Sequence, residues 1–112
     1  MPYTLGIDIG TFESKGVLVD HNGRVAAMAT APHEMIVPRP GWAQRGDDEA
    51  RWRDFVSITK RLLADSGIDP AEIKAVATSA IGPCMLPVDA GGAPLMNGVL
   101  YGVDTRAHAE ID

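Results

Sequence analysis

The sequence predicts a mixed α/β domain, and three observations support this fold class. Three apolar segments with strand-like patterns lie within the first 31 residues, separated by short turns. A helical pattern of apolar residues follows over about residues 47–66, and a further strand-like run follows at residues 74–79. We therefore expect a mixed sheet that opens with three antiparallel strands, with flanking helices.

The first strand is predicted over residues 3–9, where apolar residues alternate with others and Asp8 points to the opposite face. A second strand is predicted over residues 15–20 and a third over residues 25–31. The pair Asn22–Gly23 separates them and suits a tight hairpin turn. Consecutive strands joined by such short turns are antiparallel.

Residues 32–46 contain several prolines and glycines, so this stretch is predicted to be an irregular surface loop. The helix predicted over residues 47–66 begins at two aspartates that can cap it. Its apolar face is expected to pack on the sheet through Trp52, Phe55 and Leu62.

Shorter elements are predicted in the second half of the chain. Residues 69–72 suggest a helical turn, and residues 85–88 and 99–103 suggest two further strands. Asp104 is expected to cap a helix that follows it.

The composition excludes some function classes. With 15 acidic and 10 basic residues, the formal charge is −5, which argues against a nucleic-acid-binding surface because such surfaces need clustered Lys and Arg. The chain has one cysteine, no basic leader segment, and no apolar run near the roughly 18 residues of a membrane span. We expect a folded cytoplasmic protein with no nucleic-acid or membrane partner.

The segment GIDIGTFESK, residues 6–15, carries the most chemical information. Gly10 lets the backbone approach a ligand closely, the amides near Thr11 can point at phosphate oxygens, and Lys15 can add a positive charge. Asp8, at the end of the strand, is the residue type that holds hydrated Mg²⁺. Taken alone, the pattern Asp-x-Gly-Thr also suits an ordinary hairpin, so both interpretations stay open.

Longer stretches carry a family resemblance. DIGTFESKGVLVD resembles the first phosphate motif of the actin/Hsp70/sugar-kinase ATPase superfamily, whose members share a ribonuclease H-like domain. PGWAQRGDDEARW, together with the later Asp-x-x-Gly-x-Pro-Leu pattern at residues 89–95 and Asp-x-Arg at residues 104–106, is similar to the amino-terminal domain of FGGY carbohydrate kinases, in xylulokinase-like order and spacing. The resemblance implies a ribonuclease H-like, actin-like ATPase fold, with residues 1–112 as the incomplete amino-terminal part of the first kinase domain.

The resemblance also implies an activity, the ATP-dependent phosphorylation of a sugar or polyol hydroxyl by the full-length enzyme. It assigns roles to two groups of residues. Those expected to serve Mg²⁺ and the ATP phosphates are Asp8, Gly10, Thr11 and Lys15. Those expected on the sugar side are Ile81, Gly82, Pro83, Asp104 and Arg106, although the last two could also simply cap and pair on a helix.

The chain departs from the family pattern in ways that leave the substrate open. Many members have polar sugar-contacting residues where this chain has Ile81–Pro83. No catalytic residue is expected within the chain, since the resemblance places the general base beyond Asp112 and the ATP-binding carboxy-terminal domain is absent. Residues 1–112 alone are therefore expected to be inactive, and to self-associate through uncovered apolar surface, with a homodimer as one form.

Two alternatives to a kinase follow from the same residues. One is an actin- or Hsp70-like nucleotide switch, and the other is a non-catalytic stand-alone module.

The three histidines show no metal-ligand spacing and are expected to be solvated; they are His21, His33 and His108.

Overall fold

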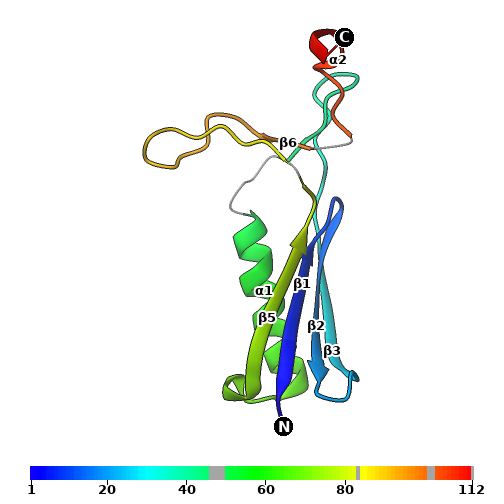
Figure 1. Cartoon of the computed structure of the whole chain (residues 1–112), viewed down its shortest axis with the longest axis vertical. Coiled ribbons are helices and arrows are strands. Elements are labelled where there is room, and N and C mark those ends of the chain that lie inside the picture. The colour runs from blue at the N-terminus through cyan, green and yellow to red at the C-terminus, as the bar shows by residue number, and fades with distance from the viewer. Residues whose placement is uncertain (46–49, 83, 101–102, 112) are drawn as a thin grey trace. The chain divides into compact units, whose positions relative to one another are not determined.

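The computed structural model describes residues 1–45, 50–82, 84–100 and 103–111 (Figure 1). The chain forms two compact units, each treated by itself below. The first comprises Met1–His33 and Ala50–Ala80, and the second comprises Glu34–Glu49 and Ile81–Asp112.

The first unit is built on a four-stranded mixed sheet (Figure 1). Its strands are β1 (Tyr3–Ile9), β2 (Glu13–Asp20), β3 (Val25–Pro32) and β5 (Ile73–Ala80), in the order β3-β2-β1-β5. The first three strands pair antiparallel, and β5 pairs parallel with β1. The predicted opening of three antiparallel strands and the later strand that joins them are confirmed.

Helix α1 (Ala50–Ser66) packs against β1, β2 and β3. It ends as predicted before Gly67, whose φ of +68° suits glycine. A 3₁₀ turn, η1 (Pro70–Glu72), then leads into β5 and confirms the predicted helical turn. The core between helix and sheet consists of Leu5, Ile7, Ile9, Leu18, Ala29, Ile58 and Leu62. The predicted start of the helix at residues 47–49 lies outside the described residues.

The predicted packing through Trp52 is wrong. Its side chain is 67% exposed and stacks on the ring of Phe55, with the two ring centroids 5.4 Å apart. The predicted packing of Phe55 and Leu62 on the core is confirmed, and Ile58, rather than Trp52, is the further helix residue buried against the sheet. Trp52 precedes Ile58 by six residues, which turns it about 120° away from Ile58 around the helix axis.

The second unit contains two short strands, β4 (Gln44–Arg45) and β6 (Gly98–Val99), which pair antiparallel, and a short helix, α2 (His108–Ile111). β4 lies in the stretch predicted to be a loop. The strand predicted over residues 85–88 is wrong, because Met85 and Val88 form only isolated bridges.

Two further predictions for the second unit need correction. Of the strand predicted over residues 99–103, only Val99 belongs to a described strand, and residues 101–102 lie outside the described residues. Asp104 is not the cap of α2, because that helix begins at His108.

We expect Gly16→Ala to destabilise the first unit by about 1–3 kcal/mol, because overpacking strains a filled core. A Cβ atom at Gly16 would overlap Ile58 Cγ2 and lie 3.1 Å from Leu62 Cδ1. Gly6→Ala is the matched control, since its added Cβ meets Val17 at an ordinary 3.4 Å. Chemical denaturation measures both changes, and equal unfolding free energies for the two variants would contradict this packing.

Candidate functional site

The predicted phosphate-side residues lie around one depression of about 280 Å³ at the end of β1. Its lining consists of Asp8, Gly10, Thr11, Phe12, Glu13 and Lys15. The structure therefore brings together all four residues that the sequence singled out for Mg²⁺ and phosphate. It adds two more, of which Phe12 is largely exposed.

The loop between β1 and β2 is tight enough to require glycine at position 10. The Gly10 N–H donates to the Glu13 carbonyl oxygen at 2.9 Å. A Cβ atom at Gly10 would lie only 2.7 Å from that same oxygen. The need here is for space, since Gly10 does not adopt a positive φ. The loop therefore keeps its backbone accessible.

Asp8 points to the sheet face opposite the core, as strand alternation predicts. The Ser79 hydroxyl on β5 donates to Asp8 Oδ1 at 2.7 Å. Oδ2 faces the loop, because it lies 3.5 Å from where a Cβ atom of Gly10 would be. A single carboxylate with one oxygen directed to an open depression fits Mg²⁺, which keeps most of its waters in such sites. Ser79 was missed from the sequence, although β1–β5 register places it directly beside Asp8.

Lys15 sits across the strand pair from Asp8 and contributes the positive charge of the depression. Its Nζ lies 3.1 Å from Glu13 Oε1, and both side chains are about half exposed. Exposed pairs of this kind contribute little to stability. Lys15 can therefore exchange this partner for a phosphate at small cost.

His33 is not solvated as predicted, but ties the loop to α1. Its side chain is 11% exposed, with Nε2 2.7 Å from the Gly10 carbonyl oxygen and Nδ1 3.1 Å from Asp54 Oδ2. The buried Ser14 hydroxyl donates to the same Asp54 oxygen at 2.6 Å. His21 and His108 are exposed, as predicted.

Asp54 and Ser14 were missed although the sequence carries a signal for each. Asp54 precedes Ile58 and Leu62 by four and eight residues, which puts a carboxylate on the buried stripe of α1. Ser14 alternates with Gly16 and Leu18 on the core face of β2. A polar residue on a buried stripe needs a partner, and these two supply one another.

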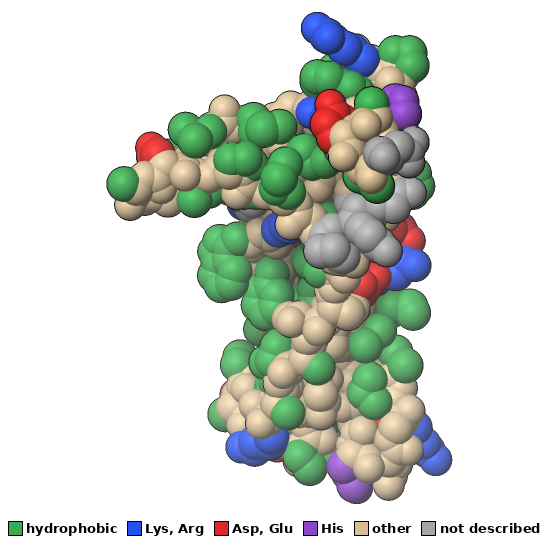
Figure 2. All heavy atoms as spheres, turned by 45° about the horizontal axis from the view of Figure 1, so that its top comes forward, with side chains coloured by type: hydrophobic (Ala, Val, Ile, Leu, Met, Phe, Trp, Pro, Cys, Tyr) green, Lys and Arg blue, Asp and Glu red, His purple; other side chains and the backbone are tan. Residues whose placement is uncertain are grey.

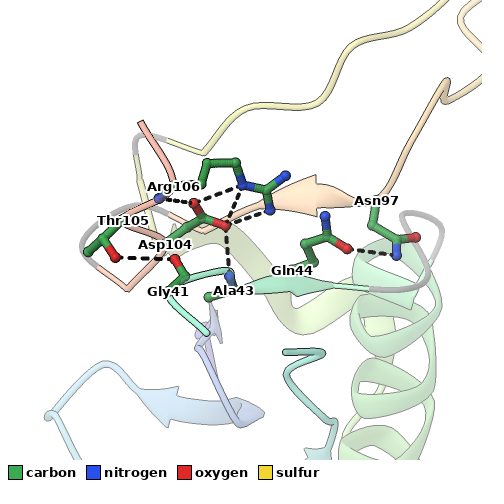
Figure 3. A network of polar contacts seen from close by, with 7 residues as sticks. All are labelled: Gly41, Ala43, Gln44, Asn97, Asp104, Thr105 and Arg106. Carbon is green, nitrogen blue, oxygen red and sulfur yellow. Dashed lines mark hydrogen bonds and ion pairs between the residues drawn. The ribbon is translucent and has the colours of Figure 1, made fainter. Parts of the chain in front are cut away.

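The residues predicted for the sugar side belong to the second unit. Ile81 and Gly82 directly follow β5, and Pro83 lies outside the described residues. Asp104 and Arg106 form the polar network in Figure 3. The Asp104 carboxylate accepts from the Ala43 N–H at 2.7 Å and from Arg106 Nη2 at 2.6 Å. With a side chain only 3% exposed, Asp104 is engaged from two chain segments.

Trp42 completes this network. The Arg106 guanidinium lies over its ring, 3.8 Å from the centroid, and that of Arg39 lies 5.0 Å away. The Arg106 guanidinium beside Asp104 holds the pKa of that carboxyl well below its usual range, and the Ala43 N–H adds to this, whereas burial opposes it. The network also includes the Thr105 hydroxyl bond to the Gly41 carbonyl oxygen (Figure 3).

The segment of residues 84–97 exposes apolar side chains. Figure 2 shows hydrophobic side chains gathered along this segment, and those that the structure describes as exposed are Met85, Leu86, Val88, Leu95 and Met96.

Within the described ranges, no helix is long and apolar enough to cross a membrane. Nor do three or more metal-ligating side chains of the His, Cys, Asp or Glu type gather anywhere in that part of the chain.

The mixed sheet, its covering helix and the loop after β1 define an α/β domain of the ribonuclease H-like, actin-like ATPase class. The backbone superimposes on the crystal structure of a ligand-bound xylulose kinase from Lactobacillus acidophilus with a TM-score of 0.86 and 25% identity, over 99% of this chain and 22% of that one. Residues 3–112 match the model of the amino-terminal domain of the FGGY family of carbohydrate kinases. The chain belongs to this family.

Curated relatives agree with this assignment. An L-xylulose/3-keto-L-gulonate kinase of Escherichia coli is 34% identical over 105 residues, which cover 94% of this chain and 21% of that protein. A glycerol kinase of Methylibium petroleiphilum is 29% identical over 102 residues, which cover 90% of this chain and 20% of the relative. The chain thus spans about a fifth of the length of these relatives.

Asp104 should make the second unit acid-sensitive. Because its pKa is lowered on folding, its contribution to stability is present above about pH 4 and is lost as the pH falls toward the folded-state pKa. We expect Asp104→Asn to cost about 2 kcal/mol near neutral pH and progressively less in acid. Urea denaturation followed by Trp42 fluorescence, in a Trp52→Phe background, measures this.

The control for this experiment is Asp65→Asn, which changes an exposed aspartate on α1. It should leave the acid dependence of the Trp42 transition intact. If Asp104→Asn also leaves that dependence unchanged, the Arg106 pairing does not stabilise the folded state as described.

Proposed function

We propose that the protein to which this chain belongs transfers the γ-phosphoryl group of ATP to a hydroxyl of a sugar or polyol. The observation that carries the proposal is the convergence of Asp8, Gly10, Thr11 and Lys15 on one depression at the end of β1. Because the chain belongs to a carbohydrate kinase family, we interpret this depression as the site of Mg²⁺ and the ATP phosphates. It also favours a kinase over a nucleotide switch or a non-catalytic module.

In this proposal the first unit holds the phosphates and the metal. The loop at Gly10 and Thr11 offers backbone donors, and Lys15 offers a point charge. Asp8 would hold Mg²⁺, with Ser79 fixing the orientation of its carboxylate. Bound there, the ion would neutralise charge on the transferring phosphoryl group.

The transfer itself is a displacement at phosphorus. The acceptor hydroxyl oxygen bonds to the γ-phosphorus, the bond to the β–γ bridging oxygen breaks, and ADP leaves. The hydroxyl proton passes to a carboxylate base that we place beyond residue 112. Such a reaction depends on positioning and charge neutralisation, and the residues of this chain supply both on the phosphate side.

The sugar side is proposed to include Ile81, Gly82, Pro83, Asp104 and Arg106. The contacts of Asp104 support an indirect part for its carboxylate, because Arg106 and the Ala43 N–H already occupy it. It would fix the Arg106 guanidinium over Trp42, and that face would meet the substrate.

Asp8→Asn in the full-length enzyme should lower kcat by about two orders of magnitude, or roughly 2.7 kcal/mol, with little effect on the sugar KM. The substitution keeps the shape of the side chain but removes the charge that balances Mg²⁺. Steady-state kinetics and thermal unfolding should be measured on the same preparation. A stable and fully active variant would remove Asp8 from the site.

Ser79→Ala is a milder substitution that tests the same carboxylate. It leaves the Asp8 charge in place and removes only its 2.7 Å hydrogen bond, so a smaller loss of kcat is expected. A loss as large as that of Asp8→Asn would indicate that the pair acts as one structural unit.

The activity itself is tested by screening the full-length protein with ATP and Mg²⁺ against sugars and polyols, with ADP release as the readout. The panel should include glycerol, D- and L-xylulose, 3-keto-L-gulonate and gluconate. We expect at least one acceptor to give turnover that requires both ATP and the acceptor. Folded protein that phosphorylates no sugar or polyol would overturn the proposed function.

A further inference from the structure

His33 contacts the loop between β1 and β2 through both its backbone and its ring. Its N–H donates to the Phe12 carbonyl oxygen at 2.8 Å, and ring Nε2 lies 2.7 Å from the Gly10 carbonyl oxygen. Ring Nδ1 faces Asp54 Oδ2 on α1 at 3.1 Å. The imidazole therefore bridges the loop and the helix.

The ring contact at Gly10 has a defined direction. A carbonyl oxygen only accepts hydrogen bonds, so the Nε2–H of the ring donates to the Gly10 carbonyl oxygen. Ring Nδ1 faces Asp54 Oδ2, which also accepts from the Ser14 hydroxyl, so the ring is held between the loop and α1.

The bond to Gly10 also fixes the amide of the next residue. In a trans peptide, the Gly10 C=O and the Thr11 N–H point in opposite directions in one plane. Because the carbonyl turns toward His33, the Thr11 N–H turns away from it. A hydrogen bond to the carbonyl also polarises the peptide and strengthens that N–H as a donor. The Gly10 N–H is not available, since it bonds the Glu13 carbonyl oxygen.

We infer that His33 is a positioning residue that directs the Thr11 amide at the phosphate groups of the nucleotide. The inference rests on the proposed kinase function for its ligand. Its structural part, the hydrogen bond from the ring to the Gly10 carbonyl oxygen, is independent of that function and is tested separately.

The first test is NMR of the Thr11 amide in the ¹⁵N-labelled 112-residue chain. Loss of the ring donor in His33→Phe should shift the Thr11 amide signal, whereas the exposed-site change His21→Gln should leave it in place. A Thr11 amide signal that is unchanged in His33→Phe would overturn the inference.

The second test is the kinetics of the full-length kinase. His33→Phe removes the donor and should raise the ATP KM about tenfold, while the sugar KM stays unchanged. His33→Gln keeps a donor that can reach Gly10, and Asp54→Asn changes the ring's contact on α1 without removing its donor. Each of these two variants should raise the ATP KM about threefold. His21→Gln is the matched control and should not change it. A purely structural role for His33 would lower the yield of folded enzyme and leave the ATP KM as it is.

The outcomes of the two tests distinguish the inference about His33 from the proposed kinase function. A shifted Thr11 amide signal with the ATP KM unchanged in His33→Phe overturns the positioning role and leaves the kinase assignment intact. A wild-type enzyme without ATP-dependent transfer overturns the proposed function and, with it, the role of His33, whatever the Thr11 amide signal shows.

Discussion

The close approach of α1 to the β1–β2 hairpin at Gly16 is the constraint on which the first unit depends. Ile58 and Leu62 occupy the space that a side chain at position 16 would fill. Asp54 lies one helical turn before Ile58 on the same stripe, so this packing also brings its carboxylate to Ser14 and His33. The loop after β1 is therefore anchored by the same contact that builds the core.

Strand alternation gives the hairpin two different faces. Residues at even positions from Ser14 to Leu18 turn toward α1, while Lys15 turns to the face that carries Asp8. A slip of one residue in the pairing would exchange these faces and move Asp8 into the core. The buried apolar residues thus fix the register that places Asp8 and Lys15 on the face opposite the core. The stability of the sheet and the position of these two charges therefore depend on the same packing.

Local patterns allowed much of this to be predicted, and non-local contacts set the limit. The strands of the first unit, the helix end at Gly67 and the clustering of Asp8 with Lys15 follow from short-range alternation and turn chemistry. His33 could not be placed in this way, because its ring meets Gly10 through the β2–β3 register, which pairs Glu13 with Pro32. Two-residue strands such as β4 carry no periodicity, so the loop prediction for residues 32–46 missed it.

The Asp-x-Arg pattern at residues 104–106 contributes to the fold of the second unit and belongs to the proposed sugar side. The Asp104 carboxylate is nearly buried, and a charge in that position is tolerated only with partners, which Arg106 and the Ala43 N–H provide. A sugar hydroxyl that bound Asp104 directly would have to displace one of these bonds. The Arg106 guanidinium is the more exposed member, at 21%, and lies flat on Trp42. The geometry therefore makes Asp104 the support of the Arg106 guanidinium, a relation that the spacing of the two residues alone does not reveal.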